Sequence, residues 1–217
     1  MNKIIKDTLI LLVITLISGT ALGFVYNFTK EARAMQEEKV KNEAYKTVFK
    51  EASSFGAAIS VDDDALSKYI LDRDVKTKSE DSSYENDTIN AQINEIVEAL
   101  DKDGNVLGYV ITVTDNEAYD GAIKFSVGIT KEGIVNGISY LSISETPGLG
   151  MKATEDSFIE NFSNKDVDYF KYTKSGAVAD NEVDALSGAT ITTNAVTNGV
   201  TAAIYCFDFI TGGDGNE

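Results

Sequence analysis

The hydrophobic residues divide the chain into one unbroken apolar stretch near its start and a series of patterned segments behind it. Residues 8–28 contain no charged residue over 21 positions. As a helix rising about 1.5 Å per residue, this stretch spans about 31 Å, which matches the hydrocarbon core of a bilayer. We therefore predict a transmembrane anchor over residues 1–29.

A cleaved signal peptide is the competing interpretation, because Ala32-Arg33-Ala34 has the small-x-small form of a cleavage site. The apolar stretch is longer than the roughly 7–15 residues of a signal peptide core, and a helical pattern continues behind it. Both features favour a retained single-pass anchor. Lys3 and Lys6 precede the span, which favours a cytoplasmic N-terminus and an extracytoplasmic domain, although Lys30 and Arg33 follow it.

Residues 30–90 read as a helical stalk followed by an acidic, polar segment that packs on the domain. Apolar residues recur every four positions at Val40, Ala44, Val48 and Ala52. The run Asp62-Asp63-Asp64 invites a calcium hypothesis, but it lacks the spaced oxygen ligands of a calcium loop. A helix start or a solvated face is the better interpretation of this run.

Four segments with alternating apolar residues follow, at residues 93–100, 106–114, 121–129 and 134–143. Asp101–Asn105 separates the first two and is typical of a hairpin turn, because its glycine comes too early for a calcium loop. The alternation predicts an antiparallel meander with one buried face. Helix, strands and helix together indicate an α+β domain over residues 91–211, with a flexible tail at residues 212–217.

Composition restricts the chemistry. The chain has 35 acidic and 19 basic residues and a net charge of −16, which argues against nucleic acid as a partner. It has no histidine, and its one cysteine, Cys206, lies in an apolar run typical of a core. These absences leave no protein metal site or catalytic residue to predict from the usual patterns. Any redox chemistry would need a borrowed cofactor.

The stretch DALSGAT, Asp184 to Thr190, is unusually rich in small residues and leads into a helical pattern. The apolar face of that pattern consists of Val196, Val200, Ile204 and Phe207. Hydroxyl residues before such a face are typical of a helix N-cap. A helix N-terminus also attracts phosphate through its unpaired N–H groups and partial positive charge. A cap and an anion site are compatible interpretations here.

A second motif, SETPGLG, contains Pro147, the only proline, in a turn whose backbone can approach another group closely. Alone it would be an ordinary loop. An anchor, the strands LGYVITV and AYDGAIKFSVGI, the loop Glu145–Gly150 and the motif Asp184–Thr190, in this order, resemble the FMN-binding-domain family. Within it the chain resembles the G subunit of the Rnf-type ion-translocating ferredoxin:NAD oxidoreductase. The resemblance covers most of the chain but not residues 60–90.

The resemblance implies FMN joined through its phosphate to the Thr190 hydroxyl, by a separate flavin transferase that uses FAD and recognises Asp184. The family pattern often has glycine where this chain has Ala185. The implied cofactor-binding residues fall into two groups. Those near the phosphate are Ser187, Gly188, Ala189, Thr192 and Thr193, and those near the ring are Glu145, Thr146, Gly148 and Leu149.

The implied function is that of an electron-carrying subunit, not an independent catalyst, working with other membrane and iron–sulfur subunits. Two alternatives stay open. One is a flavin carrier like the C subunit of a sodium-translocating NADH:quinone reductase, or another extracytoplasmic flavin module. The other is a cofactor-free surface binding module. The sequence also leaves open whether Cys206, Tyr119 or Tyr140 touches the flavin ring.

Overall fold

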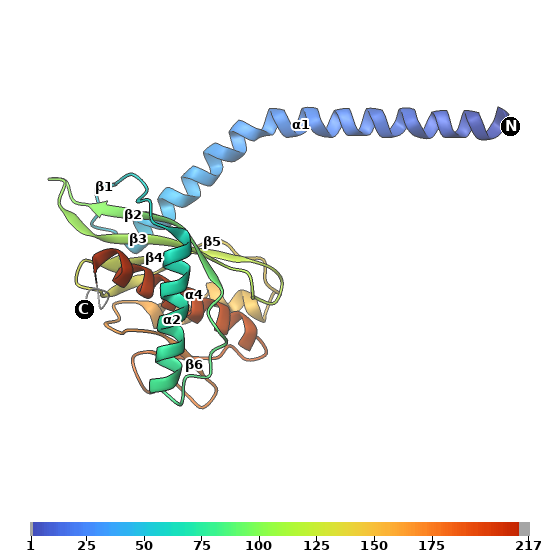
Figure 1. The fold of residues 1–217 in the computed structure, drawn as a ribbon. Helices are drawn as coiled ribbons and strands as arrows, with labels where there is room; N and C mark the ends of the chain where they lie inside the picture. Colours follow the sequence, from blue (N-terminus) through green and yellow to red (C-terminus); the bar gives the residue numbers. More distant parts are fainter. Residues whose placement is uncertain (1, 213–217) are drawn as a thin grey trace. The chain divides into compact units, whose positions relative to one another are not determined.

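The computed structural model describes residues 2–212 (Figure 1). The chain divides into two compact units, residues 1–42 and 43–217. Helix α1(Asn2–Val48) forms the first unit and supplies the first residues of the second. Within the described residues, α1 is the one helix long and apolar enough to cross a membrane, and none of its apolar stretch is buried. Of the predicted tail, residues 213–217 lie outside the described residues.

The second unit is built on a five-stranded antiparallel sheet with the order β1-β2-β3-β4-β5. Its strands are β1(Ser54–Phe55), β2(Ala91–Leu100), β3(Val106–Asp115), β4(Ile123–Thr130) and β5(Val135–Ser142). The predicted meander is confirmed, with strand ends that differ from the prediction by one or two residues. The predicted hairpin turn is also confirmed, because Asp101 Oδ1 accepts hydrogen bonds from the N–H groups of Asp103 and Asn105, both at 2.8 Å.

The prediction of a single buried face is wrong, because both faces of the sheet are covered. Helix α4(Thr190–Thr211) packs on one face (Figure 1). On the other, Tyr45, Val48 and Phe49 cluster with residues of β2 and β3. Two glycines allow the close approach: a Cβ at Gly128 would lie 2.8 Å from Val48 Cβ, and one at Gly108 would lie 2.7 Å from Phe49 Cζ.

The acidic run after the stalk is a helix start, as predicted. Asp62 is the N-cap of α2(Asp63–Glu80), and its Oδ1 accepts hydrogen bonds from the N–H groups of Asp64 and Ala65 at 3.1 and 3.0 Å. Helix α2 packs against α4, where the Thr77 and Tyr205 hydroxyls lie 2.7 Å apart. Helix α2, in the segment of residues 60–90 that the resemblance does not cover, is therefore part of the domain.

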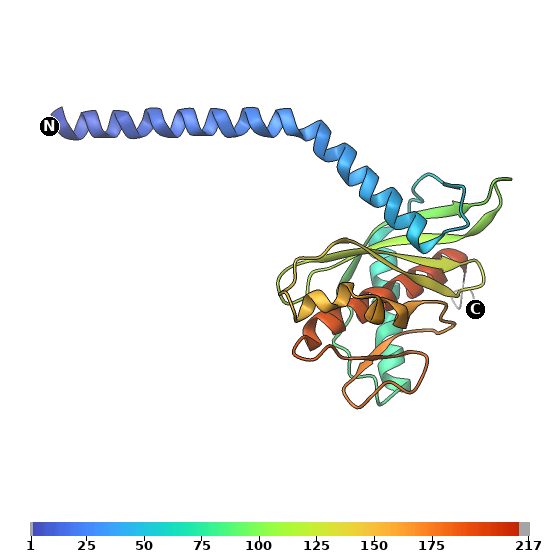
Figure 2. The same ribbon diagram turned by 180° about the vertical axis from the view of Figure 1, so that it is seen from behind.

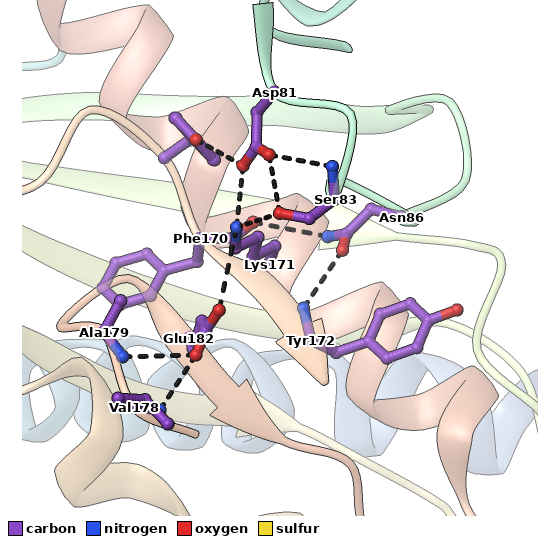
Figure 3. Close-up of polar contacts among 10 residues, drawn as sticks. Asp81, Ser83, Asn86, Phe170, Lys171, Tyr172, Val178, Ala179 and Glu182 are labelled. Carbon is purple, nitrogen blue, oxygen red and sulfur yellow. Dashed lines mark hydrogen bonds and ion pairs between the residues drawn. The ribbon is translucent and has the colours of Figure 1, made fainter. Parts of the chain in front are cut away.

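The segment behind α2 contributes a buried asparagine to the interior. Asn86 Nδ2 donates to Phe170 O, Thr197 Oγ1 and Asn198 Oδ1 at 3.3, 3.0 and 2.9 Å. Its Oδ1 accepts from the Tyr172 N–H at 3.1 Å (Figure 3). Residues 192–207 of α4 are buried all round, because the sheet, α2 and β6 pack against this helix, whereas the sequence predicted only one apolar face.

Two short segments bring the chain from the sheet to the start of α4. The helical turns η1(Gly150–Thr154), α3(Asp156–Ile159) and η2(Glu160–Phe162) follow β5, and η1 lies beside α4 (Figure 2). Next, β6(Lys171–Thr173) pairs in parallel with β7(Glu182–Asp184) over three residues. Strand β7 ends at Asp184, so the DALSGAT segment runs from this small sheet into α4.

A candidate cofactor cleft at the start of helix α4

The two motifs singled out in the sequence line one cleft. Its volume is about 520 Å³, inside the roughly 300–1,000 Å³ range of small-molecule sites. One wall is the loop after β5 and the other is the first turn of α4. The lining residues are Tyr119, Glu145, Thr146, Leu149, Gly150, Gly188, Ala189, Thr190, Ile191 and Thr192.

No side chain of the described residues 2–212 caps the start of α4. Its N-cap residue is Ala189, with φ −138° and ψ 45°, and it makes no side-chain hydrogen bond. The interpretation of DALSGAT as a hydroxyl N-cap is therefore wrong. Within the part of the chain that the structure describes, the N–H groups of Ile191 and Thr192 donate no hydrogen bond. These donors and the positive end of the helix dipole border the cleft where Thr190, half-buried, begins the helix.

Thr192 adds an unpaired donor at the same place. Its side chain is fully buried, and its Oγ1 has no hydrogen-bond partner among residues 2–212. A buried hydroxyl without a partner costs free energy, so such a group indicates a missing ligand or a functional constraint. Gly150 lies against it: a Cβ there would collide with the Glu145 carboxylate and lie 2.7 Å from Thr192 Oγ1.

The facing loop is fixed by its own backbone and by Glu145. The Thr146 carbonyl accepts from the N–H groups of Leu149 and Met151 at 3.1 and 3.2 Å. Buried Glu145 accepts a hydrogen bond from the Asp120 N–H at 3.3 Å, which ties the loop to the connection between β3 and β4. Leu149 reaches the other wall, because a Cβ at Gly188 would lie 3.0 Å from Leu149 Cδ2.

Four of the expected site residues, three for the cofactor and Asp184 for the transferase, are not in the lining of the cleft. Ser187 and Gly148 are exposed beside it. The Thr193 hydroxyl is turned inward, accepting from the Leu186 N–H and donating to Ala189 O, both at 3.0 Å. Asp184 is also exposed, and its Oδ1 accepts from the Ala177 N–H at 2.7 Å.

The three residues left open in the sequence analysis are now placed. Tyr119 lines the cleft and is 71% exposed. Tyr140 packs edge-on against Phe125 in the core. Cys206 is fully buried in the core as expected, and burial raises the pKa of its thiol to about 12. Tyr140 and Cys206 are outside the lining of the cleft.

Sequence reasoning missed Ile191. It is 50% exposed at the second position of α4 and lines the cleft. The available sequence signal was an isoleucine among threonines directly after the motif that ends at Thr190, outside the apolar face of the predicted helix. Among the described residues, no group of three or more His, Cys, Asp or Glu is placed to hold a metal ion.

Comparison with known proteins gives the site a family context. The FMN-binding domain family matches residues 118–205, which include both walls of the cleft. The G subunit of the proton-translocating ferredoxin:NAD(+) oxidoreductase complex of Clostridium ljungdahlii is 28% identical over 212 residues, covering 98% of this chain and 96% of that protein. The corresponding subunit of the Na(+)-translocating complex of Acetobacterium woodii is 35% identical over 108 residues, covering 48% and 51% of the two chains.

Among solved structures, the chain is similar to NqrC of Shewanella oneidensis, with a TM-score of 0.43 and 19% identity over 51% of this chain and 54% of that one. The C subunit of the Na(+)-translocating NADH-quinone reductase of Parabacteroides distasonis gives a TM-score of 0.43 and 18% identity, covering 76% and 80% of the two chains. The chain thus matches the FMN-binding domain family over residues 118–205 and, along almost its whole length, is similar to the G subunits of the ion-translocating ferredoxin:NAD(+) oxidoreductases.

Proposed function

We propose that this chain carries FMN, joined through its phosphate to the Thr190 hydroxyl, as the membrane-anchored flavin subunit of an Rnf-type ion-translocating ferredoxin:NAD oxidoreductase. One observation carries the proposal: the uncapped start of α4, with Thr190 on it, faces the Glu145–Gly150 loop across a cleft inside the matched segment. The chain holds and exposes a redox cofactor for its partners and is not an independent catalyst.

The start of α4 supplies what a phosphate needs. The free N–H groups of Ile191 and Thr192 and the helix dipole attract a negative charge, and the unpaired Thr192 hydroxyl can donate a hydrogen bond. This local attraction is needed because the chain as a whole carries a net charge of −16. Gly188 and Ala189 add almost no side-chain bulk in front of the helix, which leaves the approach to Thr190 open.

The remaining lining suits a flat, partly apolar ring. Tyr119, Leu149 and Ile191 are exposed apolar or aromatic side chains around the opening of the cleft. Exposed side chains of this size gathered at one opening are typical of a binding surface. When bound, FMN supplies one- and two-electron redox chemistry, and the chain's own residues position the ring and limit its contact with water.

The attachment needs a partner. A flavin transferase brings FAD, the Thr190 oxygen forms a bond to the FMN phosphorus, and the bond from that phosphorus to AMP breaks. AMP leaves, and the hydroxyl proton passes to a base or to water. Asp184, exposed at the first position of the motif that ends at Thr190, is proposed to help the transferase recognise the segment.

The sequence around the first helix supports a location for the domain. Lys3 and Lys6 support a cytoplasmic N-terminus, so the domain lies on the extracytoplasmic side. Electrons then reach the flavin through other membrane and iron–sulfur subunits. The similarity to the G subunit of the Clostridium ljungdahlii complex along almost the whole chain supports this complex over the related quinone reductase.

In-gel fluorescence tests the attachment. The full chain is produced together with a flavin transferase and run on a denaturing gel under ultraviolet light. We expect a fluorescent band for the unmodified chain and for Thr190→Ser, which keeps a hydroxyl, and a dark band for Thr190→Val, which has nearly the same shape without one. A fluorescent Thr190→Val band contradicts the assignment of Thr190, and a dark unmodified chain beside an active transferase contradicts the function.

A further inference from the structure

The loop that precedes the attachment segment (residues 185–190) is exposed, yet several of its backbone N–H groups are hydrogen-bonded. Residues 174–180, between β6 and β7, are all exposed, and Val178 at the tip is 94% exposed. Exposed loops of this kind normally leave their N–H groups to water. Here three consecutive N–H groups, those of Ala177, Val178 and Ala179, are all bonded to side chains of β7.

Two carboxylates provide these bonds. Glu182 Oε2 accepts from Val178 N–H at 2.8 Å and from Ala179 N–H at 3.2 Å (Figure 3). Asp184 Oδ1 accepts from Ala177 N–H at 2.7 Å. The carboxylates stand two residues apart on one strand and therefore point to the same side of it. The bonds to Val178 and Ala179 hold the pKa of Glu182 below its usual value.

Glu182 is in turn connected to the body of the domain. Its Oε1 lies 3.7 Å from Lys171 Nζ, and that ammonium donates to Asp81 Oδ2 at 2.7 Å and to Ser83 Oγ at 2.6 Å (Figure 3). Lys171 is only 9% exposed. A mostly buried ammonium with three partners is fixed in place, and it holds Glu182 toward the end of α2.

The attachment segment begins where these bonds end. After Asp184, the Ala185 N–H donates to Thr173 O at 2.8 Å, and the Leu186 N–H donates to Thr193 Oγ1 at 3.0 Å. The paired part of β6 and β7 is only three residues long, and so short a two-stranded sheet has little stability of its own. The carboxylate bonds supply the order that the strand pairing lacks.

We propose that Glu182 is a positioning residue for flavin attachment: with Asp184 it braces the loop 174–181 against β7 and so holds the segment that presents Thr190. The proposal rests on the proposed function. A braced segment spends more of its time in the conformation that the transferase binds. Loss of the brace raises the KM of the chain as a substrate, because only a fraction of the molecules is competent, and leaves kcat nearly unchanged. In this proposal Asp184 also helps to position the segment, through the hydrogen bond that it accepts from the Ala177 N–H.

Amide hydrogen exchange of the flavin-free full chain tests, without any flavin chemistry, whether the Glu182 and Asp184 carboxylates hold the loop. We expect the N–H groups of Ala177, Val178 and Ala179 to be protected although the loop is exposed. In Glu182→Ala, exchange at Val178 and Ala179 rises by roughly tenfold or more. In Glu182→Gln it stays low, since one oxygen accepts both bonds. In Val178→Ala, which removes the exposed side chain and keeps the N–H, exchange also stays low. Unprotected amides in the unmodified chain overturn the brace.

Flavin attachment by a purified transferase, with FAD and with the chain concentration varied, tests the consequence. We expect KM to rise by roughly tenfold in Glu182→Ala and to be restored in Glu182→Gln, with Val178→Ala as the unaffected control. Loss of protection with an unchanged KM overturns the positioning role and leaves the proposed function standing. A KM that stays high in Glu182→Gln despite protected amides also overturns the positioning role, because the transferase then recognises the negative charge of Glu182 itself. An unmodified chain that takes up no flavin overturns the proposed function and this role with it.

Discussion

Replacing Asn86 by alanine removes a side chain that makes four hydrogen bonds in the interior. Two of the partners keep other bonds. Phe170 O also accepts from the Thr201 hydroxyl, and the Thr197 hydroxyl still donates to backbone carbonyls of its own helix. The Tyr172 N–H and Asn198 Oδ1 lose the only hydrogen bond found for them within the described chain. These two groups therefore set the loss of folding free energy caused by Asn86→Ala.

Leaving a buried polar group unpaired costs about 1–3 kcal/mol. Asn198 is fully buried and Tyr172 half-buried, so the free energy of unfolding falls by about 2–4 kcal/mol, out of a total of about 5–15 kcal/mol for an ordinary domain. Asn86→Asp keeps the acceptor for the Tyr172 N–H. Its second carboxylate oxygen, however, replaces the donor that Asn86 directs at Phe170 O, Thr197 Oγ1 and Asn198 Oδ1. This replacement is therefore also destabilising, and less so at low pH, where the carboxyl is protonated and can donate one bond.

Urea unfolding of the detergent-solubilised chain, followed by the near-ultraviolet circular dichroism of its tyrosines, measures these differences. Asn90→Ala is the matched control. Asn90 is an exposed asparagine in the same segment that donates to Glu117 Oε1 at 3.2 Å, and its replacement changes stability by about 0.5 kcal/mol or less. A loss at Asn86 no larger than the loss at Asn90 would refute the reasoning that this segment is part of the interior.

Two further predictions concern the buried residues Asp115 and Gly150. Burial raises the pKa of Asp115 to about 6 from the model-compound value of 3.8, so the folded state binds more protons between about pH 4 and 6 and stability falls as pH rises through that window. Asp115→Asn should lessen this fall by about 2–3 kcal/mol, measured as urea unfolding at pH 4 and pH 8, and an equal fall in both proteins would contradict the assignment. Gly150→Ala should cost about 1–3 kcal/mol and reduce flavin attachment, since its Cβ collides with the Glu145 carboxylate; thermal unfolding and in-gel fluorescence check this, and full stability with full attachment would mean that the loop moves freely.

The meander could be predicted because its signal is local. Alternating apolar residues such as Phe125 and Val127 point to one side of a strand whatever lies elsewhere in the chain. The cover on the second face could not be predicted in this way. It depends on Val48 and Phe49, at the end of a helix whose pattern read as a stalk, meeting Gly128 and Gly108 about 60–80 residues later in the chain.

The role of residues 81–90 was hidden for a similar reason. Asn86 is a polar residue in a polar segment, and its partners Thr197 and Asn198 are 111 and 112 residues away. Polar residues of this kind are usually exposed, so no local pattern indicates their burial. The site was predictable in part. The two motifs and Thr190 came from resemblance, whereas the absence of a cap at Ala189 and the unpaired hydroxyl of Thr192 are visible only in three dimensions.

The second face of the sheet has a practical consequence for anyone who needs a water-soluble version of this protein. The matched segment begins at residue 118, but the compact unit begins at Glu43. A truncation at residue 91 or later removes Tyr45, Val48 and Phe49 and exposes the apolar side chains of β2 and β3 beneath them. It also removes Asn86 from its partners on α4. A cut just before Glu43 removes the apolar span and keeps both layers, because the compact unit that carries them begins inside helix α1.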